Sequence, residues 1–141
     1  MTNCIEIKGL CKSYPDFSLQ NIDLTLPGGT IMGLIGENGS GKTTTIKCIL
    51  NLIHRDAGEI TLLGRDNLRE EQAAKAGVGV VLDECSFHDA LRPRDLECIL
   101  APVYPTWDSR LYRDYLDKFH LPGKSLIKTF SRGMKMKLSL A

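Results

Sequence analysis

One short glycine-rich segment constrains this chain more than any other feature. It reads Gly36-Glu37-Asn38-Gly39-Ser40-Gly41-Lys42-Thr43. The segment fits the pattern G-x-x-x-x-G-K-[ST], in which glycines let successive backbone N–H groups turn inward, and a helix starting at the lysine adds partial positive charge. We therefore predict a loop that holds a polyphosphate, with Lys42 at the β- and γ-phosphates and the Thr43 hydroxyl on Mg²⁺.

The residues on either side of this loop predict a strand before it and a helix after it. Residues 31–35 form a nearly continuous apolar run, which is typical of a strand buried on both faces. Apolar residues then recur with helical spacing, at Ile46, Ile49, Leu50 and Ile53. A strand before the motif and a helix after it are typical of the phosphate-binding loop of nucleoside triphosphatases. We therefore predict that residues 36–43 and Thr44 bind nucleotide. The alternative is a glycine-rich turn without a ligand.

The rest of the first half of the chain reads mainly as strands. Apolar and polar residues alternate over residues 5–8 and 21–26, which predicts half-exposed antiparallel strands. Residues 59–63 predict a further strand, 69–76 a short helix and 78–82 another buried strand. Residues 1–82 are therefore expected to form a phosphate-loop core with antiparallel strands, which makes the chain an α/β protein.

Residues 83–141 carry helical patterns and almost no run typical of a strand. Pro93 suits the first turn of a helix whose apolar stripe is Leu96, Ile99, Leu100 and Val103. Asp108 can cap a second helix, with a turn-by-turn stripe of Leu111, Tyr115 and Phe119. Ser131 can cap a third helix that runs to the last residue.

Composition narrows the class of protein further. The chain is 43% hydrophobic and 25% charged, with a formal net charge of +1, which favours a soluble globular protein and argues against nucleic acid as a partner. We see no apolar run of about 20 residues and no secretion signal, so we expect a cytoplasmic protein. The five cysteines are scattered without a C-x-x-C pair, which argues against a zinc site or a disulfide framework.

The chain resembles the ATP-binding subunits of ABC transporters over essentially its whole length. Its residues 10–14 are similar to the A-loop of that family, whose aromatic side chain stacks on adenine. The resemblance gives this role to Tyr14. A packing role for Tyr14 remains the alternative, and Phe17 is a second candidate for the adenine contact.

Residues 78–84 resemble the strand that leads into the Q-loop, although this sequence has Asp83 where the family usually has glutamine. The resemblance implies that Asp83 approaches Mg²⁺, directly or through water. A solvated loop acid is the alternative. The pair Asp83-Glu84 also follows an apolar run, but it precedes the signature described next, so we do not interpret it as the family's catalytic Asp-Glu pair.

The stretch 130–137 is similar to the Leu-Ser-Gly-Gly-Gln signature and its basic helix, with strict matches at Ser131 and Gly133. The resemblance implies that Ser131, Arg132, Gly133 and Met134 contact the ATP held by a partner subunit. A simple helix cap is the alternative. The helical segment before it lies where the family inserts its signature subdomain, and residues 104–108 resemble bacterial exporter ATPases linked to peptide-antibiotic resistance.

The resemblance implies a P-loop NTPase (RecA-like) core piece, 1–82, with N-terminal antiparallel strands, followed by an α-helical signature subdomain, 83–141. It implies ATP and Mg²⁺ as cofactors. It also implies two partners, a second ATP-binding subunit in a homo- or heterodimer and a membrane permease subunit, at the inner face of the cell membrane. The alternatives are a soluble non-transporter ABC-type ATPase and a nucleotide-binding module without catalysis.

In the family, an aspartate that orders Mg²⁺, a catalytic glutamate and a switch histidine all follow the signature. The 141 residues contain none of these after the signature, because the sequence ends at Ala141. Phosphoryl transfer depends on positioning metal and water. We therefore expect these residues to bind Mg-ATP and to hydrolyse it negligibly.

Overall fold

The computed structural model describes residues 2–82 and 86–141, which form two compact units, Met1–Gly79 and Val80–Ala141. The first unit holds an antiparallel sheet with the strand order β2-β1-β3-β4. Its strands are β1 (Asn3–Tyr14), β2 (Phe17–Pro27), β3 (Ala57–Leu62) and β4 (Arg65–Asp66). Its helices are α1 (Lys42–Ile49) and α2 (Glu71–Lys75), the latter shorter than the predicted 69–76. The division at residue 82 stays a prediction.

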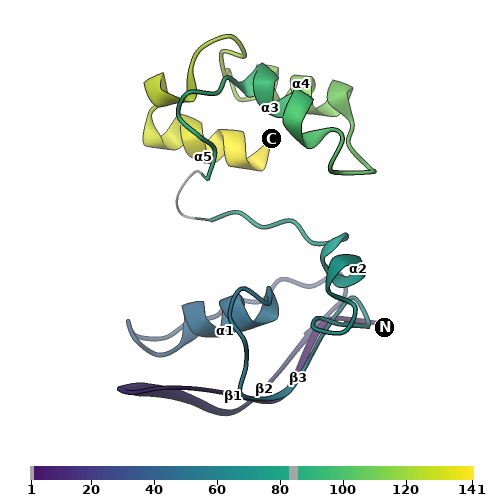
Figure 1. Cartoon of the computed structure of the whole chain (residues 1–141), viewed down its shortest axis with the longest axis vertical. Coiled ribbons are helices and arrows are strands. Elements are labelled where there is room, and N and C mark those ends of the chain that lie inside the picture. Colours follow the sequence, from purple (N-terminus) through teal and green to yellow (C-terminus); the bar gives the residue numbers. More distant parts are fainter. Residues whose placement is uncertain (1, 83–85) are drawn as a thin grey trace. The chain divides into compact units, whose positions relative to one another are not determined.

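The core of the first unit lies between the sheet and α1, which runs over one face of it (Figure 1). The buried residues of this core are Ile7, Leu10, Leu19, Cys48 and Ile60. The predicted strands 5–8 and 21–26 lie within β1 and β2, and the predicted strand 59–63 corresponds to β3. The alternation of apolar residues predicts these strands because every second side chain of a strand points to the same face of the sheet.

Two predicted buried strands are wrong. Residues 31–35 and 78–82 are not part of any strand, and within the described residues neither segment is paired with a neighbouring strand. The side chain of Ile31 is fully exposed and that of Ile35 is 94% exposed. An apolar run supplies the side chains for a strand, but the strand also needs a second chain segment to receive its backbone hydrogen bonds.

The apolar stripe predicted for α1 is also only partly right. Ile46 is 44% exposed, and the buried residues within the helix are Thr45 and Cys48. These two small side chains are three positions apart, so they share a face and let α1 approach the sheet closely. Burial raises the pKa of the Cys48 thiol, which fits the interpretation of Cys48 as a small buried apolar residue.

The described residues of the second unit form three α-helices and one turn of 3-10 helix around their own core. They are α3 (Pro93–Leu100), α4 (Ser109–Lys118), η1 (Ile127–Thr129) and α5 (Arg132–Leu140). The predicted starts are confirmed: Pro93 occupies the first turn of α3, the Asp108 carboxylate accepts the N–H groups of Arg110 and Leu111 at 2.9 Å, and Ser131 precedes α5. None of the helices in the described ranges is long and apolar enough to cross a bilayer.

The buried faces of α3 and α4 differ from the predicted stripes. Leu96 is buried, but Ile99 is half exposed, and on α4 the buried residues are Tyr112 and Leu116 rather than Leu111. The Tyr112 hydroxyl donates to the Pro93 carbonyl oxygen at 2.9 Å, which joins α4 to the start of α3. Residues 111, 112, 115 and 116 are all apolar or aromatic, so the packing partners decide which face is buried.

Candidate nucleotide-binding site

The glycine-rich loop runs directly into α1, which begins at Lys42 as predicted. Gly39 and Gly41 have positive φ angles, 86° and 94°, and Gly41 is the residue that caps the helix. The Thr45 N–H and hydroxyl both donate to the Gly41 carbonyl oxygen, at 2.8 and 3.0 Å. The loop is therefore fixed to the first turn of α1, whose free N–H groups carry partial positive charge.

The end of the loop lies against strand β2. A Cβ atom added at Gly41 would come within 2.4 Å of Leu19 Cδ2 and 2.7 Å of Phe17 Cζ. At the other end of the loop, a Cβ on Gly36 would lie 2.6 Å from the Ser40 hydroxyl. Gly41 therefore needs glycine, both for its positive φ angle and for its close approach to β2, whereas a side chain at Gly36 would displace the Ser40 hydroxyl.

The Lys42 side chain folds back over this loop. Its Nζ donates to the carbonyl oxygens of Gly36 and Glu37, both at 2.7 Å, and lies 3.4 Å from the Ser40 hydroxyl. The ammonium thus stands at the centre of the loop. A phosphate oxygen that entered the loop would meet a cation, a helix N-terminus and glycine backbone, which is the chemistry that anion sites use.

A pocket of about 440 Å³ lies beside the loop. Its lining comprises Asp16, Phe17, Asn38, Gly39, Gly41, Lys42, Thr43 and Thr44. The loop residues were predicted and the structure brings them together, with Thr43 exposed in the pocket wall. Sequence reasoning missed Asp16. The turn 15–16 of the β1–β2 hairpin was the available signal, because the hairpin register sets Phe17 opposite Tyr14 and leaves Asp16 at its tip.

Tyr14 lies at the end of β1 and is 45% exposed. It does not line the pocket beside the loop, whereas Phe17 does. The Lys12 ammonium lies 5.5 Å from the centroid of the Tyr14 ring, and its ion pair with Asp56, at 2.8 Å, raises the pKa of Lys12. A base that stacked on this face of Tyr14 would compete with a cation.

The predicted signature residues lie in the second unit, at the start of α5. The Ser131 hydroxyl accepts the Met134 N–H at 3.2 Å, so it serves as a helix cap. Arg132 and Gly133 are exposed, and Met134 packs against the core of the unit. The start of α5 is thus solvent-exposed at residues 131–133, with one of its N–H groups capped by Ser131. The predicted metal ligand Asp83 lies outside the described residues.

The comparison with known protein families decides the assignment. The sequence profile described as ABC transporter matches residues 19–141, which is most of the chain. The chain belongs to the ABC transporter family. Its α/β architecture is the P-loop NTPase fold of the ATP-binding subunits of this family, with antiparallel strands added at the N-terminus.

Individual ABC relatives match almost the whole chain. It is 30% identical over 137 residues to the ABC transporter ATP-binding protein YtrB of Bacillus subtilis, covering 96% of this chain and 47% of the relative. It is 28% identical over 144 residues to the bacitracin transport ATP-binding protein BcrA of Bacillus licheniformis, and the match covers 100% of this chain and 47% of the relative. The chain therefore spans about half the length of these curated relatives.

A solved structure of the ATP-binding subunit of an ABC transporter superposes on the chain with a TM-score of 0.85 at 25% identity, covering 97% of this chain and 60% of that one. A second structure, cbiO1 from Clostridium perfringens, gives a TM-score of 0.73 at 17% identity and supports the fold alone. The two matches agree with the family profile.

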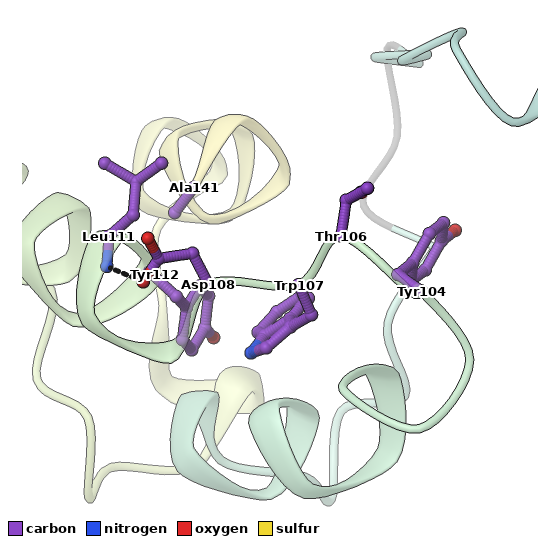
Figure 2. A pocket seen from close by; sticks show the side chains of 7 residues that line it. All are labelled: Tyr104, Thr106, Trp107, Asp108, Leu111, Tyr112 and Ala141. Atoms are coloured by element: carbon purple, nitrogen blue, oxygen red, sulfur yellow. Dashed lines mark hydrogen bonds between the residues drawn. The ribbon is translucent and has the colours of Figure 1, made fainter.

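The ABC-family helical unit has a second, aromatic pocket of about 280 Å³ (Figure 2). It is lined by Tyr104, Thr106, Trp107, Asp108, Leu111, Tyr112 and Ala141. Trp107 packs on Tyr112 with ring centroids 5.0 Å apart, and its indole N–H donates to the Ser109 hydroxyl at 3.1 Å. Tyr104 is 54% exposed. Trp107 is therefore a packing residue, and none of the predicted nucleotide-binding residues lines this pocket.

Proposed function

We propose that this chain is the nucleotide-binding portion of an ATP-binding subunit of a bacterial ABC transporter of the exporter type. The observation that carries the proposal is the Lys42 ammonium, held over a glycine-lined loop at the N-terminus of α1. Family membership supports ATP as the ligand. The exporter type is supported by relatives named for bacitracin transport and for daunorubicin/doxorubicin resistance.

In this proposal the triphosphate occupies the loop formed by residues 36–44. The phosphate oxygens replace the Gly36 and Glu37 carbonyls as partners of Lys42, and the loop amides donate to them. The Thr43 hydroxyl, exposed in the pocket, would hold Mg²⁺. Bound Mg²⁺ would neutralise part of the phosphate charge. Phe17 or Tyr14 would carry the adenine.

The proposal assigns the exposed start of α5 to a second site. Ser131, Arg132, Gly133 and Met134 would face the ATP bound to another ATP-binding subunit, because free N–H groups at a helix N-terminus suit a phosphate. A membrane permease would be the second partner, at the inner face of the cell membrane. Division of the chain into a nucleotide-binding part, 1–82, and a signature-bearing part, 83–141, belongs to the same proposal.

Isothermal titration calorimetry with Mg-ATP tests the proposal. Lys42→Ala removes the cation of the loop and should weaken binding by about 10- to 100-fold, which corresponds to the loss of about one charge-assisted hydrogen bond to the ligand, about 1.5–3 kcal/mol. Lys47→Ala is the matched control, because Lys47 is exposed in the last turn of α1. Equal affinity of Lys42→Ala and the unmodified chain for Mg-ATP would contradict the proposed site.

The expectation that these 141 residues bind ATP without turning it over has its own test. Phosphate release by the pure chain should stay at the background of Lys42→Ala. A turnover of about 1 per second, abolished by Lys42→Ala, would show that the chain supplies a base of its own for the attacking water.

A further inference from the structure

The C-terminal end of α1 is tied to the sheet by one buried amide. A helix leaves its last four carbonyl groups without partners inside the helix. In α1 the backbone N–H groups of residues 50–52 donate to the carbonyl oxygens of Ile46, Lys47 and Cys48. The Asn67 side-chain nitrogen donates to the carbonyl oxygens of both Cys48 and Ile49, each at 2.9 Å.

Asn67 is itself fixed from the other side. It is fully buried, its backbone N–H donates to the Ile60 carbonyl oxygen at 3.0 Å, and its side-chain oxygen accepts from Arg55 Nη1 at 2.6 Å. Arg55 Nε donates to the Gly58 carbonyl oxygen at 2.9 Å, in strand β3. Both N–H donors of the Asn67 amide and its oxygen are therefore engaged, and the Arg55 cation lies near the negative end of α1.

Apolar packing also holds α1 against the sheet, because Cys48 belongs to the core of the first unit and Ile49 packs against that core. The buried side chains of the helix, Thr45 and Cys48, are small. At its N-terminus the helix is held by the approach of Gly41 to Leu19 and Phe17. In addition to the apolar packing, α1 is therefore held at both of its ends, at the glycine-rich loop and at Asn67.

We infer that Arg55 and Asn67 are positioning residues for nucleotide binding. By fixing the end of α1 they fix Lys42 and Thr43, which lie seven and six residues before Ile49, or about 9–10 Å along the helix at 1.5 Å per residue. A buried, fully satisfied polar network holds one geometry, and a shift of about 1 Å in a ligand-binding group is costly. The inference depends on the nucleotide-binding function proposed above.

The test compares Mg-ATP with AMP, which lacks the β- and γ-phosphates that Lys42 would meet. Asn67→Asp removes both donors and sets a carboxylate against two carbonyl oxygens. We expect about tenfold weaker Mg-ATP binding and unchanged AMP binding, measured by calorimetry well below the unfolding temperature. Gln72→Glu is the control, because it makes the same amide-to-acid change at an exposed position of α2.

A milder pair of variants covers the case in which Asn67→Asp does not fold. Arg55→Met removes the bond that orients the Asn67 amide and should also weaken Mg-ATP binding, whereas Arg55→Lys keeps a donor and should restore it in part. Lower thermal stability of the variants, with Mg-ATP affinity equal to that of the unmodified chain, would overturn the inference and leave a purely structural role.

Hydrogen exchange separates this inference from the proposed function. Without nucleotide, the Thr45 amide, which donates to the Gly41 carbonyl oxygen at 2.8 Å, should exchange faster in Asn67→Asp or Arg55→Met than in the unmodified chain. If the unmodified chain binds no Mg-ATP, the proposed function fails, and this exchange result still decides whether the Arg55–Asn67 pair fixes the start of α1. Unchanged exchange of the Thr45 amide would overturn the inference.

Discussion

Gly41 is the point at which a single methyl group should do most damage to the phosphate loop. Its φ angle is 94°, a region in which side chains with a Cβ atom are strained. The Cβ of an alanine would also lie 2.4 Å from Leu19 Cδ2 and 2.7 Å from Phe17 Cζ, well inside contact distance. Gly41→Ala must therefore distort either the loop or its packing on β2.

The size of the effect follows from these two terms. Left-handed backbone at a residue with a Cβ costs about 1–2 kcal/mol. Forcing extra volume into a packed site costs about 1–3 kcal/mol more. Gly41→Ala should thus lower the free energy of unfolding of the first unit by about 2–5 kcal/mol. Gly39→Ala is the matched control, because Gly39 has a φ of 86° but nothing within 4 Å of the added Cβ, so only the first term applies.

The assay must follow the first unit separately from the second. The only tryptophan of the chain, Trp107, belongs to the second unit, so its fluorescence reports that unit. Hydrogen exchange of the buried amides around Ile7 and Ile60 reports β1 and β3. We expect Gly41→Ala to reduce their protection by about 1–3 kcal/mol more than Gly39→Ala does. Equal effects of the two variants would refute the argument that Gly41 is packed against Leu19 and Phe17.

Two further predictions concern Asp16 and Tyr112. Asp16 lines the pocket beside the loop, so its carboxylate should repel a triphosphate. In calorimetric titrations, Asp16→Asn should strengthen the binding of Mg-free ATP by about 2- to 5-fold and should strengthen the binding of Mg-ATP by a smaller factor. An equal effect with and without Mg²⁺ would contradict this. Burial, with a smaller effect of Glu97, raises the pKa of Tyr112 to about 12. Since the unfolded side chain titrates near 10, the native state holds its proton longer, and stability should fall as the pH rises from about 10 to 12. In urea unfolding followed by Trp107 fluorescence, the stability of Tyr112→Phe should fall less steeply with pH over this range than that of the unmodified chain. An identical slope of stability against pH for the two proteins would show that Tyr112 is not protected from ionisation.

Local chemistry made several elements predictable from the sequence. The glycine loop and the start of α1 follow from the motif, because the helix begins at the lysine that ends it. The starts of α3, α4 and α5 follow from Pro93, Asp108 and Ser131, whose effects act within the first turn of a helix. The alternation in β1 and β2 likewise marks the hairpin.

Features that depend on distant partners could not be predicted in this way. Residues 31–35 and 78–82 have the apolar side chains of buried strands, but a ladder needs a neighbouring strand that no local pattern encodes. The choice of Tyr112 over Leu111 on α4 depends on what packs against the helix. Asp16 reaches the pocket only because the β1–β2 hairpin lies beside the loop.

The sequence by itself determined that a glycine-rich loop carrying Lys42 opens α1, because backbone freedom at the glycines and the charge of Lys42 are properties of a few adjacent residues. Tertiary structure alone decided how that loop is held. Gly41 meets side chains of β2 that lie 22 and 24 positions earlier, and Asn67 reaches the helix end from 18 and 19 positions later. Contacts between such distant residues form only when the chain folds, and they fix where Lys42 can stand.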